Sequence, residues 1–362
     1  MVARQLAEAG HHVTVFDRRD HVAGNCHSER DDETGVMVHV YGPHIFHTRW
    51  DHVWDYVNRF GEFCEYEHRV KATVGGLVYT MPINLHTINQ FFGRAMGPAE
   101  ASAFIAAKAE PPPDIRTFED QALAMVGRDL YEAFFAGYTR KQWGLDPSDL
   151  PASVLQRLPM RFTYDDRYFD HPHQGIPRSG YTDVVASILD HPSIDVVLST
   201  ELQGRFDHVV WTGPIDAYFD YRFGRLAYRT LDFERSTHDH DVQGCAVMNY
   251  CDASIPYTRV TEFRHFAPWE SPAGSVTYRE TSRAHQPGDV EYYPVRLARD
   301  QALLGSYLDA ARAERGVTFL GRLGTYRYLD MDVTVKEALE AAEVIRRELA
   351  AERTPPVFTL AP

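Results

Sequence analysis

Arginines and aromatic residues gather in five short patches of this sequence. Guanidinium groups bind phosphate oxygens, aromatic faces cover bases and sugars, and tyrosine hydroxyls reach sugar oxygens. Each patch taken alone is better explained by solvated arginines and packed aromatic rings. Together they predict a binding site for a sugar diphosphate. The patches are 134–144, 157–161, 256–259, 292–294 and 326–332.

Other kinds of site have weaker support. His44 and His47 are three residues apart in a predicted strand with no Cys or Glu partner, so we expect no metal. The run 238–241 indicates a polar loop, and no Gly-x-Ser-x-Gly or Cys/His nucleophile motif occurs. The cysteines form no CxxC pair, and four of them in so long a chain predict neither zinc nor a disulfide framework. They are Cys26, Cys64, Cys245 and Cys251.

Composition narrows the class of protein. The 362 residues carry 37 Lys+Arg and 51 Asp+Glu, a net charge of −14, with 44% hydrophobic and 24% charged residues. These are the proportions of a globular protein. No dense basic run is present to bind nucleic acid, and no apolar run approaches the roughly 18 to 20 residues of a membrane span. We expect a cytoplasmic protein.

The beginning of the chain indicates part of a nucleotide-binding unit. The pattern predicts a helix over 2–9, a stop at Gly10 and a strand over 12–17 that ends in Asp17. A helix leading into a strand with a terminal acid is the second half of a dinucleotide-binding βαβ unit, in which the acid binds a ribose. An exposed aspartate at a strand end is the alternative for Asp17. The preceding strand and glycine-rich loop would lie upstream, so we expect a start assigned late, with roughly ten to twenty further residues, or a site that has lost this part.

The other elements must bring the patches together. Alternation predicts a strand over 36–47, a hairpin around Gly75-Gly76 and several short strands over 225–300. Helical spacing predicts helices over 86–95, 98–108, 117–136, 181–190 and 333–351, and apolar runs predict strands over 207–211 and 317–320. The expected fold is mixed α/β (α+β), with a Rossmann-like domain, an inserted helical domain and an antiparallel β-sheet domain.

A series of short motifs occurs in a fixed order over nearly the whole chain. The motifs are Gly24-Asn25, the octapeptide 41–48, Gly137-Tyr138-Thr139, the tetrapeptide 141–144, Arg161-Phe162-Thr163, the tetrapeptide 174–177, the blocks 212–216 and 219–224, the tetrapeptide 256–259, Tyr292-Tyr293-Pro294 and Gly321-Arg322-Leu323. This series resembles the UDP-galactopyranose mutase family of flavoenzymes. The resemblance implies FAD-binding segments 1–68, 177–215 and 312–352. It also implies a helical domain, 84–157, ending in a mobile substrate loop, and sheet segments 69–83, 158–176 and 216–311.

The resemblance implies interconversion of UDP-galactopyranose and UDP-galactofuranose on reduced FAD. In the family, flavin N5 attacks the anomeric carbon, UDP leaves, and the N5–sugar adduct opens and recloses through another hydroxyl. Arg157 and Arg259 would stabilise the leaving diphosphate, and His47 would lie against the flavin ring. The implied substrate residues are Phe134, Tyr138, Thr139, Trp143, Tyr168, Asn249, Tyr293 and Tyr328. The implied cofactor residues are Asp17, Asn25, His44, His47, Arg322, Asp330 and Met331.

Two further positions depart from the family pattern. Ser179-Gly180-Tyr181 follows Arg178 where the family has Gly-Gly-Tyr, and His171-Pro172-His173 replaces a polar and aromatic stretch. These changes alter either sugar preference or loop packing, and packing is the simpler expectation. The family also implies a homodimer.

Two other functions stay open at this point. One is a mutase for another nucleotide sugar, because stacking of Tyr138 on the base does not distinguish sugars that differ at C6. The other is a sugar-nucleotide-binding protein without catalysis, if FAD is not retained. An amine-oxidase type of flavoenzyme is disfavoured, because an uncharged amine has no use for the pair Arg157 and Arg259.

Overall fold

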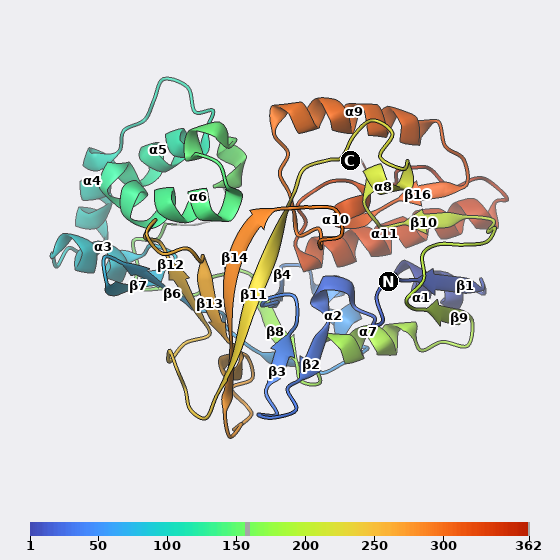
Figure 1. The fold of residues 1–362 in the computed structure, drawn as a ribbon, viewed down its shortest axis with the longest axis horizontal. Helices are drawn as coiled ribbons and strands as arrows, with labels where there is room; N and C mark the ends of the chain where they lie inside the picture. The colour runs from blue at the N-terminus through green and yellow to red at the C-terminus, as the bar shows by residue number, and fades with distance from the viewer. Residues whose placement is uncertain (156–159, 361–362) are drawn as a thin grey trace.

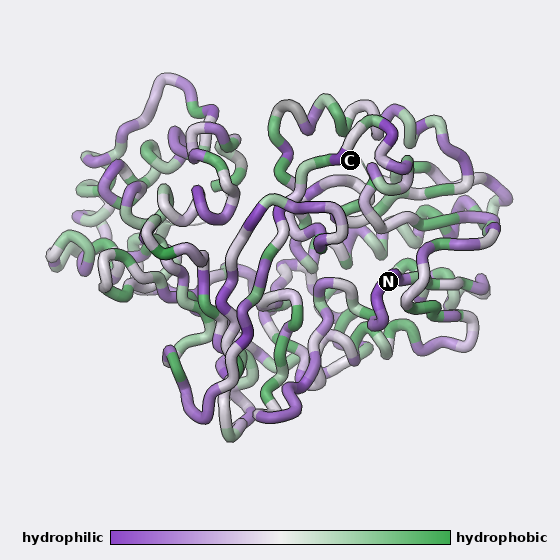
Figure 2. Tube along the Cα trace, in the orientation of Figure 1, coloured by the Kyte–Doolittle hydropathy of each residue, from purple (hydrophilic) through white to green (hydrophobic). Residues whose placement is uncertain are grey.

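The structure is a computed structural model that describes residues 1–155 and 160–360. Figure 1 shows a helical region on one side of two long strands, β11 and β14, and a mixed region of helices and short parallel strands on the other side. Both chain ends lie in the mixed region. In the described chain no helix is long and apolar enough to cross a membrane, and Figure 2 shows hydrophobic and hydrophilic residues intermixed along it.

The mixed region contains two parallel strand pairs. Strand β1 pairs with β9 and β10 pairs with β16. Apolar side chains of neighbouring helices pack against β10 and β16, whereas β1 lines the cavity described below. Parallel pairs with helical connections are the organisation of a Rossmann-like domain, as expected. The elements are α1 (Val2–Glu8), β1 (Val13–Phe16), α7 (Tyr181–Leu189), β9 (Ile194–Val197), β10 (Val209–Trp211), α8 (Ile215–Tyr218), α9 (Ala298–Arg312), β16 (Val317–Phe319), α10 (Gly321–Gly324) and α11 (Met331–Ala350).

Two small sheets lie between the mixed region and the main sheet. Strands β2 and β3 are antiparallel, and β8 lies between β4 and β5, antiparallel to both. Here β8 brings residues near 173 beside residues near 47. The elements are η1 (Gly24–Cys26), β2 (Ser28–Arg30), β3 (Met37–His39), β4 (Phe46–Thr48), α2 (Asp51–Asn58), β5 (Phe63–Glu65) and β8 (His173–Pro177).

The main sheet has seven strands in the order β15-β11-β14-β13-β12-β6-β7. The predicted hairpin around Gly75-Gly76 is confirmed as β6 and β7. The expectation of a purely antiparallel sheet is wrong at one pair, because β12 runs parallel to β6 after a long connection through the helices. The elements are β6 (Val70–Val74), β7 (Leu77–Met81), β11 (Tyr228–His238), β12 (Val247–Tyr250), β13 (Arg259–Glu262), η5 (Phe263–Phe266), β14 (Ser275–Ala284) and β15 (Tyr293–Pro294).

The helical region packs on this sheet through one shared hydrophobic core. Thr117 caps the N-terminus of the fifth helix by accepting from Asp120 N–H, whose carboxylate accepts from Thr117 N–H in return. The predicted single helix over 117–136 is interrupted, because Gly127 has φ +75° and a π-helical segment follows. The elements are α3 (Leu85–Phe92), α4 (Pro98–Lys108), α5 (Phe118–Leu130), η2 (Tyr131–Ala136), α6 (Gly137–Trp143), η3 (Pro147–Asp149) and η4 (Ala152–Val154). The boundaries of the three domains stay a prediction.

Candidate active site

A cavity of about 2420 Å³ lies where the mixed region, the small sheets and the main sheet meet. A space of this size exceeds the 300–1,000 Å³ of ordinary small-molecule sites, so it accommodates more than one ligand. It collects residues that are distant in the sequence. The predicted site residues that line it are Asp17, Asn25, His44, His47, Tyr138, Tyr168, Asn249, Arg259, Tyr293, Arg322, Tyr328, Asp330 and Met331.

Arg259 is the cation at the sheet side of the cavity. It is the first residue of β13 and faces Glu280 of β14, with Nε 2.9 Å from Oε2, although Nε is not aligned for a hydrogen bond. Burial disfavours the charge, but the carboxylate of Glu280 holds the pKa of Arg259 well above its ordinary value. The guanidinium therefore stays charged and keeps donors for an anion.

Tyrosines surround Arg259 as neutral hydroxyl groups. Burial raises the pKa of Tyr138, Tyr168 and Tyr293, so these phenols keep their protons at neutral pH. Tyr293 stacks on Tyr328 with ring centroids 5.6 Å apart, and Asn249 lies opposite Arg259 in the neighbouring strand. One cation with several hydroxyl and amide groups is suited to a phosphorylated sugar.

Helix α6 positions Tyr138 because two basic side chains fix it on the sheet. Lys141 Nζ donates to the carbonyl oxygens of Tyr250, Asp252 and Tyr257 at 2.6, 3.0 and 3.1 Å. Arg229 Nε donates to Gln142 O at 3.0 Å, and Ser282 Oγ donates to the same oxygen at 2.7 Å. The helix is therefore held at its C-terminal turn by charged and neutral donors.

Gly137 allows α6 to approach the strand connection closely. A Cβ at this position would meet the carbonyl oxygen of Cys251 in hard contact, and it would lie 3.1 Å from Ala253 N. We expect Gly137→Ala to lower the free energy of unfolding by about 1–3 kcal/mol. The matched control is Gly305→Ala in α9, where a Cβ meets nothing within 4 Å; it should stabilise by about 0.5–1 kcal/mol. Urea unfolding of both variants tests this, and equal effects would contradict it.

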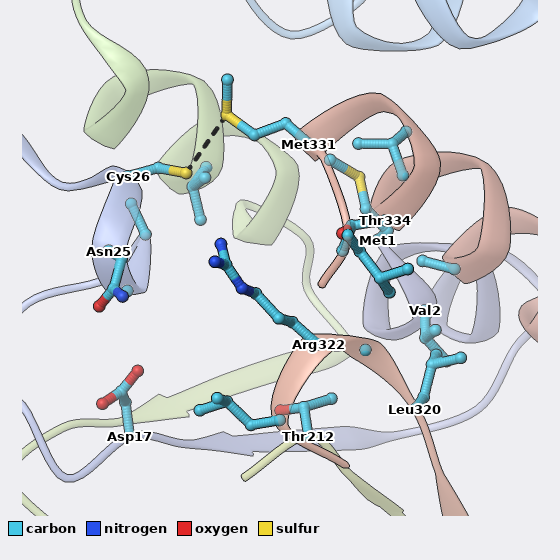
Figure 3. Close-up of a pocket in the computed structure, with 18 of the residues that line it drawn as sticks. Met1, Val2, Asp17, Asn25, Cys26, Thr212, Leu320, Arg322, Met331 and Thr334 are labelled. Atoms are coloured by element: carbon cyan, nitrogen blue, oxygen red, sulfur yellow. Dashed lines mark hydrogen bonds between the residues drawn. The ribbon is translucent and has the colours of Figure 1, made fainter. Parts of the chain in front are cut away.

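Arg322 is the second cation, at the opposite side of the cavity. It extends from α10 toward Asn25 and Cys26, as Figure 3 shows, and its Nε and Nη2 atoms are buried without a hydrogen-bond partner among the described residues. Its guanidinium lies 4.4 Å from the Tyr328 ring centroid. A buried cation with unused donors fits an anionic ligand, because leaving such donors unpaired is costly.

Other predicted cofactor residues surround Arg322. Asp17 follows β1, and Asn25 Oδ1 accepts from Arg19 Nη2 at 2.6 Å. Met331 is the first residue of α11 and contacts Cys26 with a sulfur–sulfur distance of 3.5 Å. The N-terminus of this 20-residue helix favours negative charge nearby. The end of β1, the turn η1, helix α10 and the N-terminus of α11 therefore surround a space that suits an acidic dinucleotide.

Three histidines of the cavity wall, His44, His47 and His68, and the neighbouring His39 are uncharged at neutral pH. Burial lowers the pKa of His44 and His47 to about 4, and that of His39 and His68 to about 3. His47 is stacked on Phe169 with ring centroids 3.7 Å apart. All four imidazoles are neutral at pH 7.

This burial predicts loss of stability in acid. The unfolded histidines take up protons below their ordinary pKa of about 6.5, whereas folded His39 and His68 stay neutral down to about pH 3. The free energy of unfolding therefore falls as pH drops below about 6.5, by up to about 1.4 kcal/mol per unit for each group.

Unfolding of His39→Asn between pH 7 and 5 tests this dependence. The asparagine oxygen replaces the Nδ1 atom that accepts from His44 N–H. We expect a shallower loss than in the parent, with exposed His86→Asn unchanged as the control. Equal slopes for both variants would refute the explanation.

Three predicted substrate residues do not line the cavity. Phe134 packs in the core against Tyr79 and Phe91, because its π-helical segment faces the other helices. Thr139 is buried in α6. Trp143 lies behind the cavity wall, with its ring centroid 6.4 Å from that of the lining residue Tyr293. Arg157 lies outside the described residues.

Sequence reasoning missed His68, Phe169 and the contact of His171 with the cavity wall. Nδ1 of His171 lies 2.8 Å from Nδ1 of His47. The unusual run 171–173 was the only signal for this contact. His47, His171 and Asp332 offer ligand atoms within 4.8 Å of one another. The 2.8 Å spacing is that of a hydrogen bond, whereas two nitrogen ligands of a tetrahedral metal are about 3.3 Å apart.

Comparison with known proteins gives the family. The family model described as UDP-galactopyranose mutase matches residues 133–328, and that described as NAD(P)-binding Rossmann-like domain matches residues 1–60. The chain is 54% identical to a "Probable UDP-galactopyranose mutase" of Klebsiella pneumoniae, over 99% of this chain and 95% of that protein. It is 50% identical to a "dTDP-fucopyranose mutase" of Escherichia coli, over 95% of this chain and 94% of that protein.

Solved structures support the same fold. A crystal structure of reduced UDP-galactopyranose mutase superposes with a TM-score of 0.69 at 16% identity, covering 95% of this chain and 90% of that one. This likeness concerns the fold, whereas the two sequence relatives and the matched model establish kinship. The chain therefore belongs to the UDP-galactopyranose mutase family, a family of isomerases.

Proposed function

We propose that this protein interconverts UDP-galactopyranose and UDP-galactofuranose with reduced FAD bound. The observation that carries the proposal is Arg259, a partly buried cation among neutral tyrosines in the cavity of a mutase-family chain. Arg259 would bind the diphosphate, whose negative charge increases as the sugar–oxygen bond breaks. A cation already in place stabilises that charge without reorganising.

The residues around Arg322 fit a flavin dinucleotide. The Arg322 donors without a hydrogen-bond partner among the described residues would bind the diphosphate, and the N-terminus of α11 would lie beside the polar ring. The carboxylate of Asp17, at the end of its strand, would bind the ribose. His44 and Asp330 would complete this set. Reduced FAD, when bound, would supply the electron pair that attacks the anomeric carbon.

The remaining side chains would bind and orient the nucleotide sugar. Tyr138 would stack on uracil, and the hydroxyls of Tyr168, Tyr293 and Tyr328 would donate to diphosphate or sugar oxygens. Asn249, beside Arg259, would read a sugar hydroxyl. Arg157 is proposed from the sequence alone as the second diphosphate ligand.

The test begins with the absorbance spectrum of the purified chain after incubation with FAD. Flavin bands that co-elute with the protein, and turnover of UDP-galactofuranose only after reduction by dithionite, are the expected results. A chain that binds UDP but takes up no flavin would overturn the proposal in favour of a non-catalytic binding protein.

A second candidate is favoured by one comparison. The 50% identity to a "dTDP-fucopyranose mutase" makes a dTDP-linked 6-deoxy sugar an alternative substrate. A site that hydrogen-bonds a sugar hydroxyl discriminates strongly against an analogue that lacks it. Comparing kcat/KM for UDP-galactopyranose and dTDP-fucopyranose decides between them, and a higher value for the dTDP sugar would replace our first proposal.

The family resemblance also supports a homodimer working in the cytoplasm. Sedimentation equilibrium of the flavin-loaded protein tests the first point, since a single species of 41.3 kDa would contradict it. Fractionation of the native host tests the second.

A further inference from the structure

His47 has a fixed ring but an undetermined proton. It lies in β4 and lines the cavity, and its stacking on Phe169 has an interplanar angle of 21°. A neutral imidazole carries one N–H donor and one acceptor nitrogen. What His47 offers to a ligand therefore depends on which nitrogen holds the hydrogen.

The neighbouring His171 limits the possibilities to two. Nδ1 of His171 lies 2.8 Å from Nδ1 of His47, so one of these atoms donates and the other accepts. The ring centroids are 4.8 Å apart at 45°. The pair by itself does not fix the direction of the hydrogen bond.

Arg49 fixes the direction. Its Nη2 atom lies 3.2 Å from Nε2 of His171, and a guanidinium only donates. Nε2 of neutral His171 must then be the acceptor, so its hydrogen is on Nδ1 and is donated to His47. His47 accepts at Nδ1 and carries its own hydrogen on Nε2.

The other charged groups nearby leave this result unchanged. Asp332 approaches both imidazoles, Asp330 is the N-cap residue of α11, and His68 is a neutral neighbour. If Asp332 favoured a second proton on His171, Nδ1 of His171 would still be a donor. Either state leaves the hydrogen of His47 on Nε2.

We propose that Arg49 and His171 are positioning residues that hold His47 as its Nε2–H tautomer, a hydrogen-bond donor to an acceptor atom in the cavity. His47 lines the cavity, and the hydrogen bond found for it among the described residues is made at Nδ1, not at Nε2. An unprotonated nitrogen or a carbonyl oxygen is the matching ligand group, and a flavin ring has carbonyl oxygens in both its oxidised and its reduced state. That identification of the acceptor rests on the proposed function, whereas the tautomer does not.

Long-range ¹H–¹⁵N spectra of histidine-labelled protein, without added ligand, report the protonation of each imidazole nitrogen. His47→Asn and His171→Asn assign the two sets of signals at pH 8, above the ordinary histidine pKa of about 6.5. We expect His47 protonated at Nε2 and His171 at Nδ1. Arg49→Met should shift the tautomer ratio of His47 about ten-fold toward Nδ1–H. Arg49→Lys, which keeps a donor, should restore it.

Exposed Arg116→Met is the control, because Arg116 pairs with Asp114 in the helical region. It should leave the His47 signals unchanged. Nδ1-protonated His47 in the parent, or an unchanged ratio in Arg49→Met, would overturn the proposal. If Arg49→Met failed to fold, Arg49→Leu, which also removes the donor to His171, would carry the same comparison. Failure to bind FAD would overturn the proposed function without altering these spectra.

Discussion

Arg259→Lys is expected to fold normally and to lose about 10² to 10³ in kcat/KM for the nucleotide sugar. Lysine keeps a positive charge beside buried Glu280, so the variant leaves no unpaired carboxylate in the sheet. It removes the planar fork that binds two phosphate oxygens at once. The loss should therefore appear in turnover and not in stability.

The measurement is steady-state turnover with the flavin kept reduced, together with thermal unfolding. Arg279→Lys is the matched control, because Arg279 lies in neighbouring β14 and pairs on the surface with Glu234. Its kcat/KM should stay within a factor of two. An Arg259→Lys enzyme with activity near that of the parent would show that the diphosphate binds elsewhere.

Arg322→Met is expected to weaken FAD binding about 10- to 100-fold. The basis is the loss of one or two charge-assisted hydrogen bonds at about 1.5–3 kcal/mol each, partly replaced by water. The same substitution should raise the stability of the cofactor-free chain, because it removes buried donors that have no hydrogen-bond partner in the part of the chain that the structure describes. Opposite effects on the two states distinguish a ligand-binding arginine from one that only supports the fold.

Flavin fluorescence titration measures the affinity for FAD, and urea unfolding of the cofactor-free chain measures its free energy of unfolding. Arg346→Met is the control, because Arg346 lies on the exposed face of α11 and pairs with Glu343. It should change neither. Loss of stability in cofactor-free Arg322→Met, with FAD affinity unchanged, would contradict the assigned role.

Local patterns predicted the elements well. Alternation gave the hairpin of β6 and β7 around Gly75-Gly76, and helical spacing gave α4 and α11 to within two residues. These elements depend on neighbours in the chain, so short-range sequence carries the information. The kink at Gly127 was missed because a single glycine inside a helical pattern does not show whether it keeps helical dihedral angles.

Contacts between distant segments were predictable only in part. Family motifs placed Tyr138, Arg259 and Arg322 in one site, and all three line the same cavity. Phe134, expected near the substrate, packs in the core and does not line this cavity, because an aromatic run does not reveal which ring faces the core. The contact of His47 with His171, 124 residues apart, depends on the pairing of β4 with β8, which neither strand encodes alone.

The fixing of α6 by Lys141 and Arg229 has an effect on the thermodynamics of recognition. A platform held by a cation on three carbonyl oxygens would lose little conformational entropy on stacking of the base that we propose for Tyr138. The favourable enthalpy of stacking would then be retained in the affinity, and a poorly fitting base would gain nothing from rearrangement of the platform. Under this proposal, discrimination between nucleotide bases at Tyr138 is a matter of shape, fixed at the time of folding.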